Sequence, residues 1–183
     1  MRGFIAVEVG PQPALVLLLE ALRATGADLK IVPPENLHVT LKFLGETPDD
    51  ALSAVGDAMR RAVEGEAPFR MRLRETGSFP PRSSPRVYWV GLAEAEPLRR
   101  IAERLDTALE PLGWPRERRP FAAHMTVARA RSSAGSDRAR AAMERTDVSG
   151  DVDVRRILLF RSELSRAGPK YTPRLDVPLG GGA

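Results

Sequence analysis

The sequence predicts an α+β protein of two similar lobes, in which mainly antiparallel sheets with outer helices flank a central cleft. Three observations predict this class. Strand and helix patterns are mixed along the 183 residues. Consecutive strand patterns lack a helix between them at 69–91 and after residue 152, which favours antiparallel pairing. Two strand patterns of matching composition lie 86 residues apart, close to half the chain, so we expect each lobe to contribute one.

Four segments predict helices. A stripe of leucines recurs with helical spacing after Pro11 and Pro13 and ends at Gly26, and a similar stripe ends at Gly113. Thr47 followed by Pro48 and two acidic residues is typical of a helix start, with Thr47 as the N-cap. The predicted helices cover residues 11–25, 47–64, 98–112 and 137–145.

The remaining patterns predict strands and loops. Alternating or continuous apolar runs, bounded by glycine and proline, predict strands at 1–9, 29–32, 37–44, 69–78, 87–91, 121–130, 152–162 and 171–179. A proline-rich loop occupies 79–85. We expect a single domain over residues 1–179 and a disordered glycine-rich tail at 180–183.

The composition narrows the functional classes. Hydrophobic residues make up 43% and charged residues 28%, as in an ordinary globular protein. No apolar run has membrane-spanning length, and the N-terminus becomes acidic too soon for a signal peptide, so we expect a cytoplasmic protein. The absence of cysteine excludes disulfides and thiolate sites. The net charge of +4 favours an anionic partner such as RNA only weakly, because most arginines are expected on solvated faces.

The two histidines of the chain each precede a threonine by two residues. In a strand, residues i and i+2 share a face, so His38 projects with Thr40 and His124 projects with Thr126. Apolar neighbours back both pairs. A single histidine of this kind is as well explained by a half-buried strand residue bonded to a neighbouring carbonyl. The duplicated spacing favours a shared functional cause.

Paired imidazoles suit acid–base chemistry at phosphorus. An imidazole titrates near pH 6.5, so one ring can be protonated while the other is neutral. Displacement at phosphorus needs a base for the attacking water and an acid for the departing alkoxide, and hydroxyl groups can donate to the non-bridging oxygens. This scheme requires no metal.

The sequence lacks the residues that other kinds of catalytic site require. A zinc site needs a third ligand, and no Asp, Glu or Cys stands near either motif at ligand spacing. A catalytic serine would need a Gly-x-Ser-x-Gly turn, which is absent. Glycine-rich phosphate-binding loops are absent too, so neither ATP nor a dinucleotide is indicated and we expect no cofactor.

The segments 36–45 (Asn-Leu-His-Val-Thr-Leu-Lys-Phe-Leu-Gly) and 123–129 (Ala-His-Met-Thr-Val-Ala-Arg) resemble the paired signatures of the 2H phosphoesterase superfamily. Within it, the chain is most similar to the RNA 2′,3′-cyclic phosphodiesterases, also called the 2′-5′ RNA ligase family. Segments 4–7, 85–91, 159–165 and 168–171 extend this resemblance over essentially the whole chain.

The resemblance implies a bilobal fold with pseudo-two-fold symmetry. It also implies metal-independent hydrolysis of RNA 3′ ends bearing a 2′,3′-cyclic phosphate to a 2′-phosphomonoester. His38 would be the proton donor to the leaving 3′ oxygen, His124 the proton acceptor from water, and Thr40 and Thr126 would bind the phosphate. No membrane and no obligate protein partner is implied. Three alternatives stay open: joining RNA through a 2′-5′ linkage, hydrolysis of small cyclic nucleotides, and binding of RNA ends without catalysis.

Other residues are candidates for substrate contact. Lys42 shares the His38 face by simple alternation, whereas Arg129 falls on the face opposite His124 unless a bulge or strand end turns it toward the cleft. Tyr171 and Arg161 are candidates from the closing hairpin. Aromatic residues can stack on a terminal base, although core packing is the better explanation for most of them; these are Phe4, Phe43, Tyr88 and Trp89.

Overall fold

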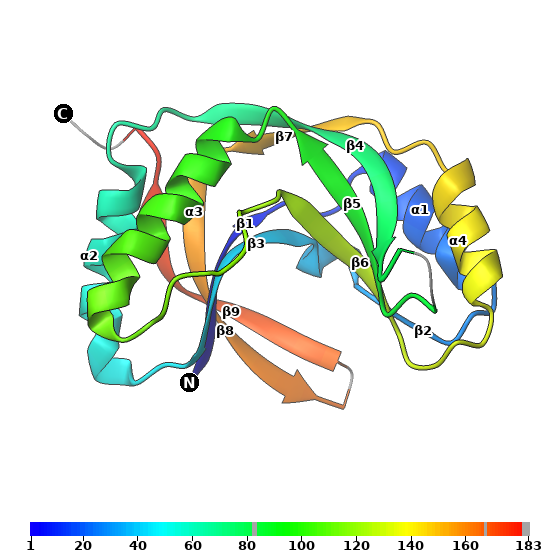
Figure 1. Ribbon diagram of the computed structural model, residues 1–183, viewed down its shortest axis with the longest axis horizontal. Coiled ribbons are helices and arrows are strands. Elements are labelled where there is room, and N and C mark those ends of the chain that lie inside the picture. The colour runs from blue at the N-terminus through cyan, green and yellow to red at the C-terminus, as the bar shows by residue number, and fades with distance from the viewer. Residues whose placement is uncertain (82–83, 167, 181–183) are drawn as a thin grey trace.

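The computed structural model describes residues 1–81, 84–166 and 168–180. The expected tail at 180–183 lies outside these residues except for Gly180. The chain forms two sheets with two pairs of helices packed outside them (Figure 1). Every strand pairing in the described residues is antiparallel, so the fold class predicted from the sequence is confirmed. No helix in this part of the chain is both long and apolar enough to cross a membrane.

The first sheet has four strands in the order β3-β1-β8-β9. Helices α2 (Leu52–Val63) and α3 (Glu96–Leu109) pack against each other and cover this sheet (Figure 1). Its strands are β1 (Arg2–Glu8), β3 (His38–Glu46), β8 (Arg156–Ser165) and β9 (Gly168–Pro178).

The second sheet has five strands in the order β2-β6-β5-β4-β7. Helices α1 (Pro13–Ala24) and α4 (Ser136–Arg145) cover it (Figure 1). Its strands are β2 (Leu29–Ile31), β4 (Phe69–Phe79), β5 (Val87–Ala93), β6 (His124–Ala130) and β7 (Gly150–Val154).

The two lobes are interleaved along the chain. Both ends of the chain contribute strands to the first sheet, and most of the second sheet comes from the middle. Helix α3 lies between β5 and β6 in the sequence, yet it packs on the first sheet, against β3. The motif strands β3 and β6 therefore belong to different sheets, as expected, but neither lobe is a continuous half of the sequence.

The structure corrects three local predictions. Residues 152–162 form parts of two strands in different sheets, because the chain leaves the second sheet at Arg155; the buried positions accordingly shift from Val152 and Val154 to Ile157. Residues 121–123 precede the strand that begins at His124. Thr47 is not an N-cap. It is buried, its hydroxyl donates to the Gly45 carbonyl, and a 3₁₀ turn at Asp49–Ala51 precedes α2.

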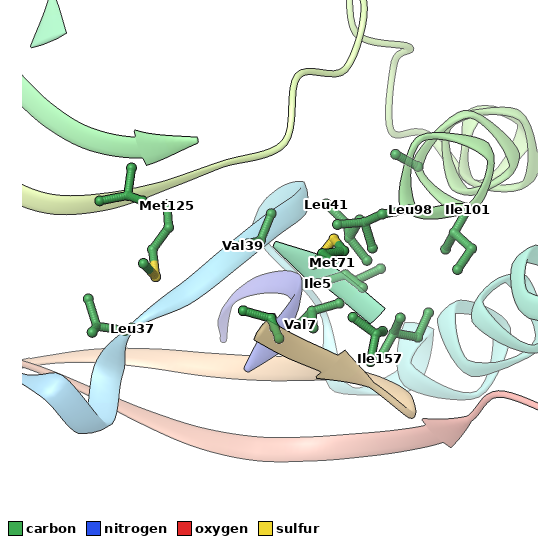
Figure 2. Packing of buried hydrophobic residues seen from close by; sticks show 14 of the residues in the cluster. Ile5, Val7, Leu37, Val39, Leu41, Met71, Leu98, Ile101, Met125 and Ile157 are labelled. Atoms are coloured by element: carbon green, nitrogen blue, oxygen red, sulfur yellow. The ribbon is translucent and has the colours of Figure 1, made fainter. Parts of the chain in front are cut away.

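A single hydrophobic core unites the backs of the two motif strands. Val39 and Leu41 from β3 and Met125 from β6 belong to one buried cluster, and Figure 2 shows Met125 close to Val39 and Leu37. Burial of each such side chain stabilises the fold by about 1.5–3 kcal/mol. Because a slip of one residue would turn a histidine into this core, the apolar backing fixes the register that exposes the opposite faces.

Candidate active site

Each motif strand carries a β-bulge directly after its threonine. Along β3, Thr40 pairs with Ala6 and Lys42 pairs with Ile5, so Leu41 is the extra residue. Along β6, Thr126 pairs with Trp89 and Ala128 pairs with Tyr88, so Val127 is the extra residue. An extra residue reverses the alternation of side chains beyond it. The two motifs therefore share more than their sequence spacing.

Lys42 consequently lies on the face opposite His38, which corrects the prediction that it shares the histidine face. It is only 3% exposed. Its Nζ lies 2.6 Å from Asp106 Oδ1, 2.6 Å from the Pro115 carbonyl and 3.4 Å from Glu117 Oε1. Side chains alternate in this simple way only along a regular strand, and the bulge after Thr40 interrupts the alternation.

The same bulges bring Phe43 and Arg129 onto the faces that carry the histidines. Phe43 is 65% exposed, and its ring centroid lies 6.3 Å from that of Phe4. Arg129 pairs with Val87 and is exposed. Its charge acts on His38 and on Tyr171, both from the first sheet, so β6 presents this guanidinium across the boundary between the lobes. The sequence left open that a bulge turns Arg129 toward the histidine face. The bulge at Val127 does this.

Both imidazoles are held by the same backbone hydrogen bond. His38 Nδ1 lies 2.6 Å from the carbonyl of Asn36, and His124 Nδ1 lies 2.8 Å from the carbonyl of Ala122. A carbonyl oxygen can only accept, so Nδ1 carries the proton in each ring. Each Nε2 then presents a lone pair when the ring is neutral and a proton when it is charged. The hydrogen bond to a neighbouring carbonyl thus exists at both histidines, and it fixes the tautomer and the orientation of each ring.

Aromatic rings flank both histidines. The His38 ring lies 5.0 Å from Phe4 and 5.3 Å from Tyr171, centroid to centroid. The His124 ring lies 5.8 Å from Phe79 and 6.4 Å from Trp89. Phe4 and Tyr171 are therefore brought to the His38 side, as the sequence suggested.

Three further aromatic or cationic residues are placed as follows. The sequence predicts Phe79 in the proline-rich loop and gives no signal for a place beside His124, whereas the structure puts it at the end of β4. Tyr88 is fully buried in the core, in line with core packing as the better explanation for most of these aromatic residues. Arg161 pairs with Gly3 and alternates with Phe160, so it lies on the face opposite Phe4 and forms an ion pair with Glu163 at 2.9 Å. The structure does not bring Arg161 to the histidines.

Burial sets the protonation of His38. The pKa of this half-buried imidazole lies below its ordinary value of 6.5, because burial removes water and because the positive charge of Arg129 disfavours a second cation. The hydrogen bond to the Asn36 carbonyl acts in the opposite direction. Burial also raises the pKa of the Tyr171 hydroxyl. In the free protein His38 is therefore mainly neutral at pH 7.

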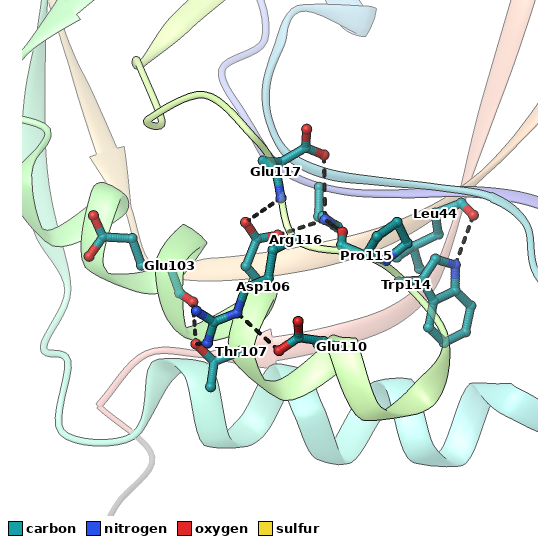
Figure 3. Close-up of polar contacts among 10 residues, drawn as sticks. Leu44, Glu103, Asp106, Thr107, Glu110, Trp114, Pro115, Arg116 and Glu117 are labelled. Atoms are coloured by element: carbon teal, nitrogen blue, oxygen red, sulfur yellow. Dashed lines mark hydrogen bonds and ion pairs between the residues drawn. The ribbon is translucent and has the colours of Figure 1, made fainter.

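Residues of β3, the strand that carries His38, also bind the irregular segment that precedes β6 and His124. Lys42 binds Pro115 and Glu117 in this segment, and the Trp114 indole donates to the Leu44 carbonyl at 2.8 Å. The Glu117 amide donates to Asp106 at 3.0 Å (Figure 3). The two motifs are thus joined by polar contacts as well as by the core.

Two further features bear on what the site can bind. In residues 1–81, 84–166 and 168–180, no group of three His, Asp or Glu side chains is placed to hold a metal ion. A cavity of about 620 Å³ lies near Glu8 and Arg156 and contains neither histidine. Three of its charged groups pair with one another: Arg156 binds Glu8 at 3.0 Å and Asp176 at 2.8 Å.

These features define a two-lobed protein in which each sheet presents one His-x-Thr strand. The chain belongs to the 2′-5′ RNA ligase superfamily, whose family model matches residues 11–166. It is 38% identical to the RNA 2′,3′-cyclic phosphodiesterase of Thermus thermophilus, over 94% of this chain and 87% of that protein. It is 33% identical to the RNA 2′,3′-cyclic phosphodiesterase of Methanothermobacter thermautotrophicus, over 94% and 95%.

Solved structures agree with this fold. A crystal structure of a Thermus thermophilus protein superposes with a TM-score of 0.81 at 36% identity and covers 99% of both chains. E. coli LigT complexed with 3′-AMP superposes with a TM-score of 0.77 over 98% of both chains. Its identity of 24% supports the fold alone.

Replacing Lys42 tests the buried contact that joins the two motifs. Lys42→Met keeps the apolar stem and leaves Asp106 without its cation, so we expect a loss of about 3–5 kcal/mol in the free energy of unfolding. Urea denaturation followed by circular dichroism measures it. Lys170→Met, at an exposed lysine, is the matched control and should change stability by less than about 0.5 kcal/mol. A loss below about 1 kcal/mol in Lys42→Met would contradict the role given to this contact.

The protonation of His38 can be measured directly, because the chain has only two histidines. We expect the NMR signal of the His38 ring to shift with pH, with a midpoint below 6.5. The variant His124→Gln retains only one histidine and therefore identifies this signal. The unfolded chain then binds this proton at higher pH than the folded protein does. His38 therefore lowers stability as the pH falls through 6.5, and His38→Gln should remove that component. A midpoint at or above 6.5 would show that burial and Arg129 do not control this group.

Proposed function

We propose that the protein hydrolyses the 2′,3′-cyclic phosphate at RNA 3′ ends to a 2′-phosphomonoester, with His38 and His124 as general acid and base and without a metal. The observation that carries this proposal is the matched state of the two imidazoles. Each donates from Nδ1 to a carbonyl, which leaves Nε2 for the substrate. The names of the curated relatives supply the substrate class.

The surroundings of the two rings favour different roles. His38 is half-buried and lies among Phe4, Tyr171 and the exposed Phe43, which suit the ribose and base of the terminal nucleoside. The leaving 3′ oxygen belongs to that nucleoside, so His38 is the proton donor. His124 is exposed and therefore accessible to water, so it is the proton acceptor.

The step balances without a co-reactant. The water oxygen bonds to phosphorus while the bond from phosphorus to O3′ breaks. The water proton passes to His124 Nε2, and the proton on His38 Nε2 passes to O3′. The product carries a 2′-phosphate and a 3′-hydroxyl. Thr40 and Thr126 donate their hydroxyl protons to the non-bridging oxygens, and Arg129 opposes their negative charge.

Substrate binding adjusts the protonation of the acid. The pKa of His38 is lowered in the free protein by burial and by Arg129, yet a proton donor must carry a proton. A bound phosphodiester brings a negative charge beside both groups. This charge favours the imidazolium and offsets Arg129, so the substrate itself raises the pKa of His38. Protonation of the acid is thereby coupled to occupation of the site.

The test uses an oligoribonucleotide with a terminal 2′,3′-cyclic phosphate in buffer containing EDTA. We expect conversion to the 2′-phosphate. His38→Ala and His124→Ala should each reduce the rate by about 10²-fold or more, because each removes a proton-transfer group. Chromatography against 2′- and 3′-phosphate standards identifies the product.

The outcomes separate the alternatives. Binding of the cyclic end without turnover would make the protein an RNA-end binder, and a 3′-phosphate product would reverse the assigned bond cleavage. Turnover of a mononucleotide 2′,3′-cyclic phosphate as efficiently as of the oligomer would favour a small cyclic nucleotide as substrate. Wild-type turnover by either alanine variant would remove that histidine from the mechanism.

A further inference from the structure

The strand registers define the order of the side chains on the face of the second sheet that carries His124. Partner residues on neighbouring strands project to the same face. Successive residues of β5 on this face pair, in order along the sheet, with Arg72 of β4 and then with His124, Thr126 and Arg129 of β6. Lys30 of β2 extends the last row, because it pairs with Arg129. Arg72 therefore lies at one end of this face and the Arg129–Lys30 row lies at the other, with the motif residues between them.

Carboxylates neutralise the end that carries Arg72. Its guanidinium lies 3.6 Å from Glu94 and 3.9 Å from Asp151. The adjacent row on the same face holds Arg70, which lies 2.8 Å from Asp153 and 3.3 Å from Asp151. Because these carboxylates offset the arginine charges, this end of the face offers little attraction to a phosphate group.

Arg74 is an exposed cation in the same row as His124, since both residues pair with Gly91. It has no ion-pair partner among the described residues. Glu75 stands beside this row, however, with its Cγ 3.2 Å from the point where a Cβ on Gly91 would lie. A carboxylate at this position opposes the approach of a further phosphate, so Arg74 is the weaker candidate for binding one.

Arg129 and Lys30 form the basic end of this face. Both side chains are exposed, and neither has an ion-pair or hydrogen-bond partner in residues 1–81, 84–166 and 168–180. The charge of Arg129 acts on His38 and Tyr171 of the first sheet, so Arg129 faces the proposed phosphate site. Lys30 stands one strand further from the histidines, about 5 Å away between backbones. The row thus offers one cation to the reacting phosphate and a second cation to a group beside it.

An RNA 3′ end brings two phosphates to the site. The proposed function places the cyclic phosphate between the histidines and the terminal nucleoside among the aromatic residues near His38. The 5′ oxygen of that nucleoside carries the phosphodiester that joins it to the rest of the strand, and a mononucleotide cyclic phosphate lacks this group. Unpaired lysine and arginine side chains attract phosphates without reading the bases. The basic end of the face therefore suits this second phosphate.

We infer that Lys30 binds the phosphodiester that precedes the terminal nucleoside, so that the RNA strand leaves the site over Arg129 and Lys30. The inference rests on the proposed function and narrows its substrate to the 3′ end of a polymer rather than a free cyclic mononucleotide. The ammonium group of a lysine binds a phosphate as a point charge on a flexible stem. Lys30 therefore determines a preference for length and not for base sequence.

The test compares kcat/KM for a dinucleotide and a mononucleotide that both end in a 2′,3′-cyclic phosphate. Lys30→Gln should lower kcat/KM for the dinucleotide by about threefold, the scale of a single exposed charge pair, and leave the mononucleotide unchanged. Lys170→Gln is the matched control, because Lys170 is exposed on β9 and lies on the face opposite Tyr171. Arg74→Gln, in the row of His124, should leave the ratio of the two substrates unchanged.

A dinucleotide with an uncharged methylphosphonate linkage provides the second arm. It keeps both nucleosides and removes only the charge between them. The wild-type protein should use it about threefold less well than the natural dinucleotide, whereas Lys30→Gln should use the two equally. Equal losses in Lys30→Gln for the mononucleotide and the dinucleotide would place Lys30 at the cyclic phosphate and overturn the inference. No loss for either substrate, or a lower ratio in Arg74→Gln, would overturn it as well.

Binding without reaction separates this inference from the proposed function. If the wild-type protein hydrolyses neither substrate, the proposed function is wrong, and the affinity for an oligoribonucleotide ending in a 2′-phosphate still tests Lys30. The dependence of log Kd on log salt concentration should become shallower by about 0.7 in Lys30→Gln, because one phosphate contact of a single strand is lost. Lys170→Gln should keep the wild-type slope. A wild-type slope in Lys30→Gln would show that Lys30 does not contact the strand.

Discussion

The hydrogen bond from each histidine Nδ1 to the carbonyl two residues before it is the interaction on which the site depends. It fixes the proton on Nδ1 in both rings, and the proposed function assigns Nε2 to the substrate. Each carbonyl is in turn placed by tertiary contacts. Asn36 donates from its side chain to the Pro169 carbonyl at 3.1 Å, and the Ala123 carbonyl beside Ala122 accepts from the Leu92 amide at 3.1 Å. Another strand of the same sheet, β9 for His38 and β5 for His124, therefore helps to orient each imidazole.

The two motif strands share a backbone arrangement but carry different side chains. The bulges after Thr40 and Thr126 place Phe43 and Arg129 at equivalent positions, one aromatic and one cationic. The positions just before them hold Lys42, a buried anchor, and Ala128, a core residue. A duplicated backbone thus carries an asymmetric set of side chains. In the proposed function, this asymmetry lets one imidazole serve the terminal nucleoside and the other serve the attacking oxygen.

The sequence predicted the fold class, most elements and the two His-x-Thr strands, because periodicity and turn residues report local structure. It could not predict the placement of Lys42, since a bulge is a property of strand pairing and the run from Leu41 to Leu44 reads as a regular strand. Phe79 carries no signal in the sequence, because its place beside Trp89 and His124 results from the pairing of β4, β5 and β6. Residues 152–162 were read as one strand, although the phase shift between Val154 and Ile157 was present in the sequence.

The proposed function requires both imidazoles to meet one phosphate. It can be tested by titrating ¹⁵N-labelled protein with the expected product, a nucleoside 2′-phosphate, and following the ring nitrogens of both histidines by long-range ¹H–¹⁵N correlation. We expect the Nε2 signals of His38 and His124 to move together along one binding curve, while both Nδ1 atoms remain protonated. Movement of only one ring, or two curves with different dissociation constants, would contradict it.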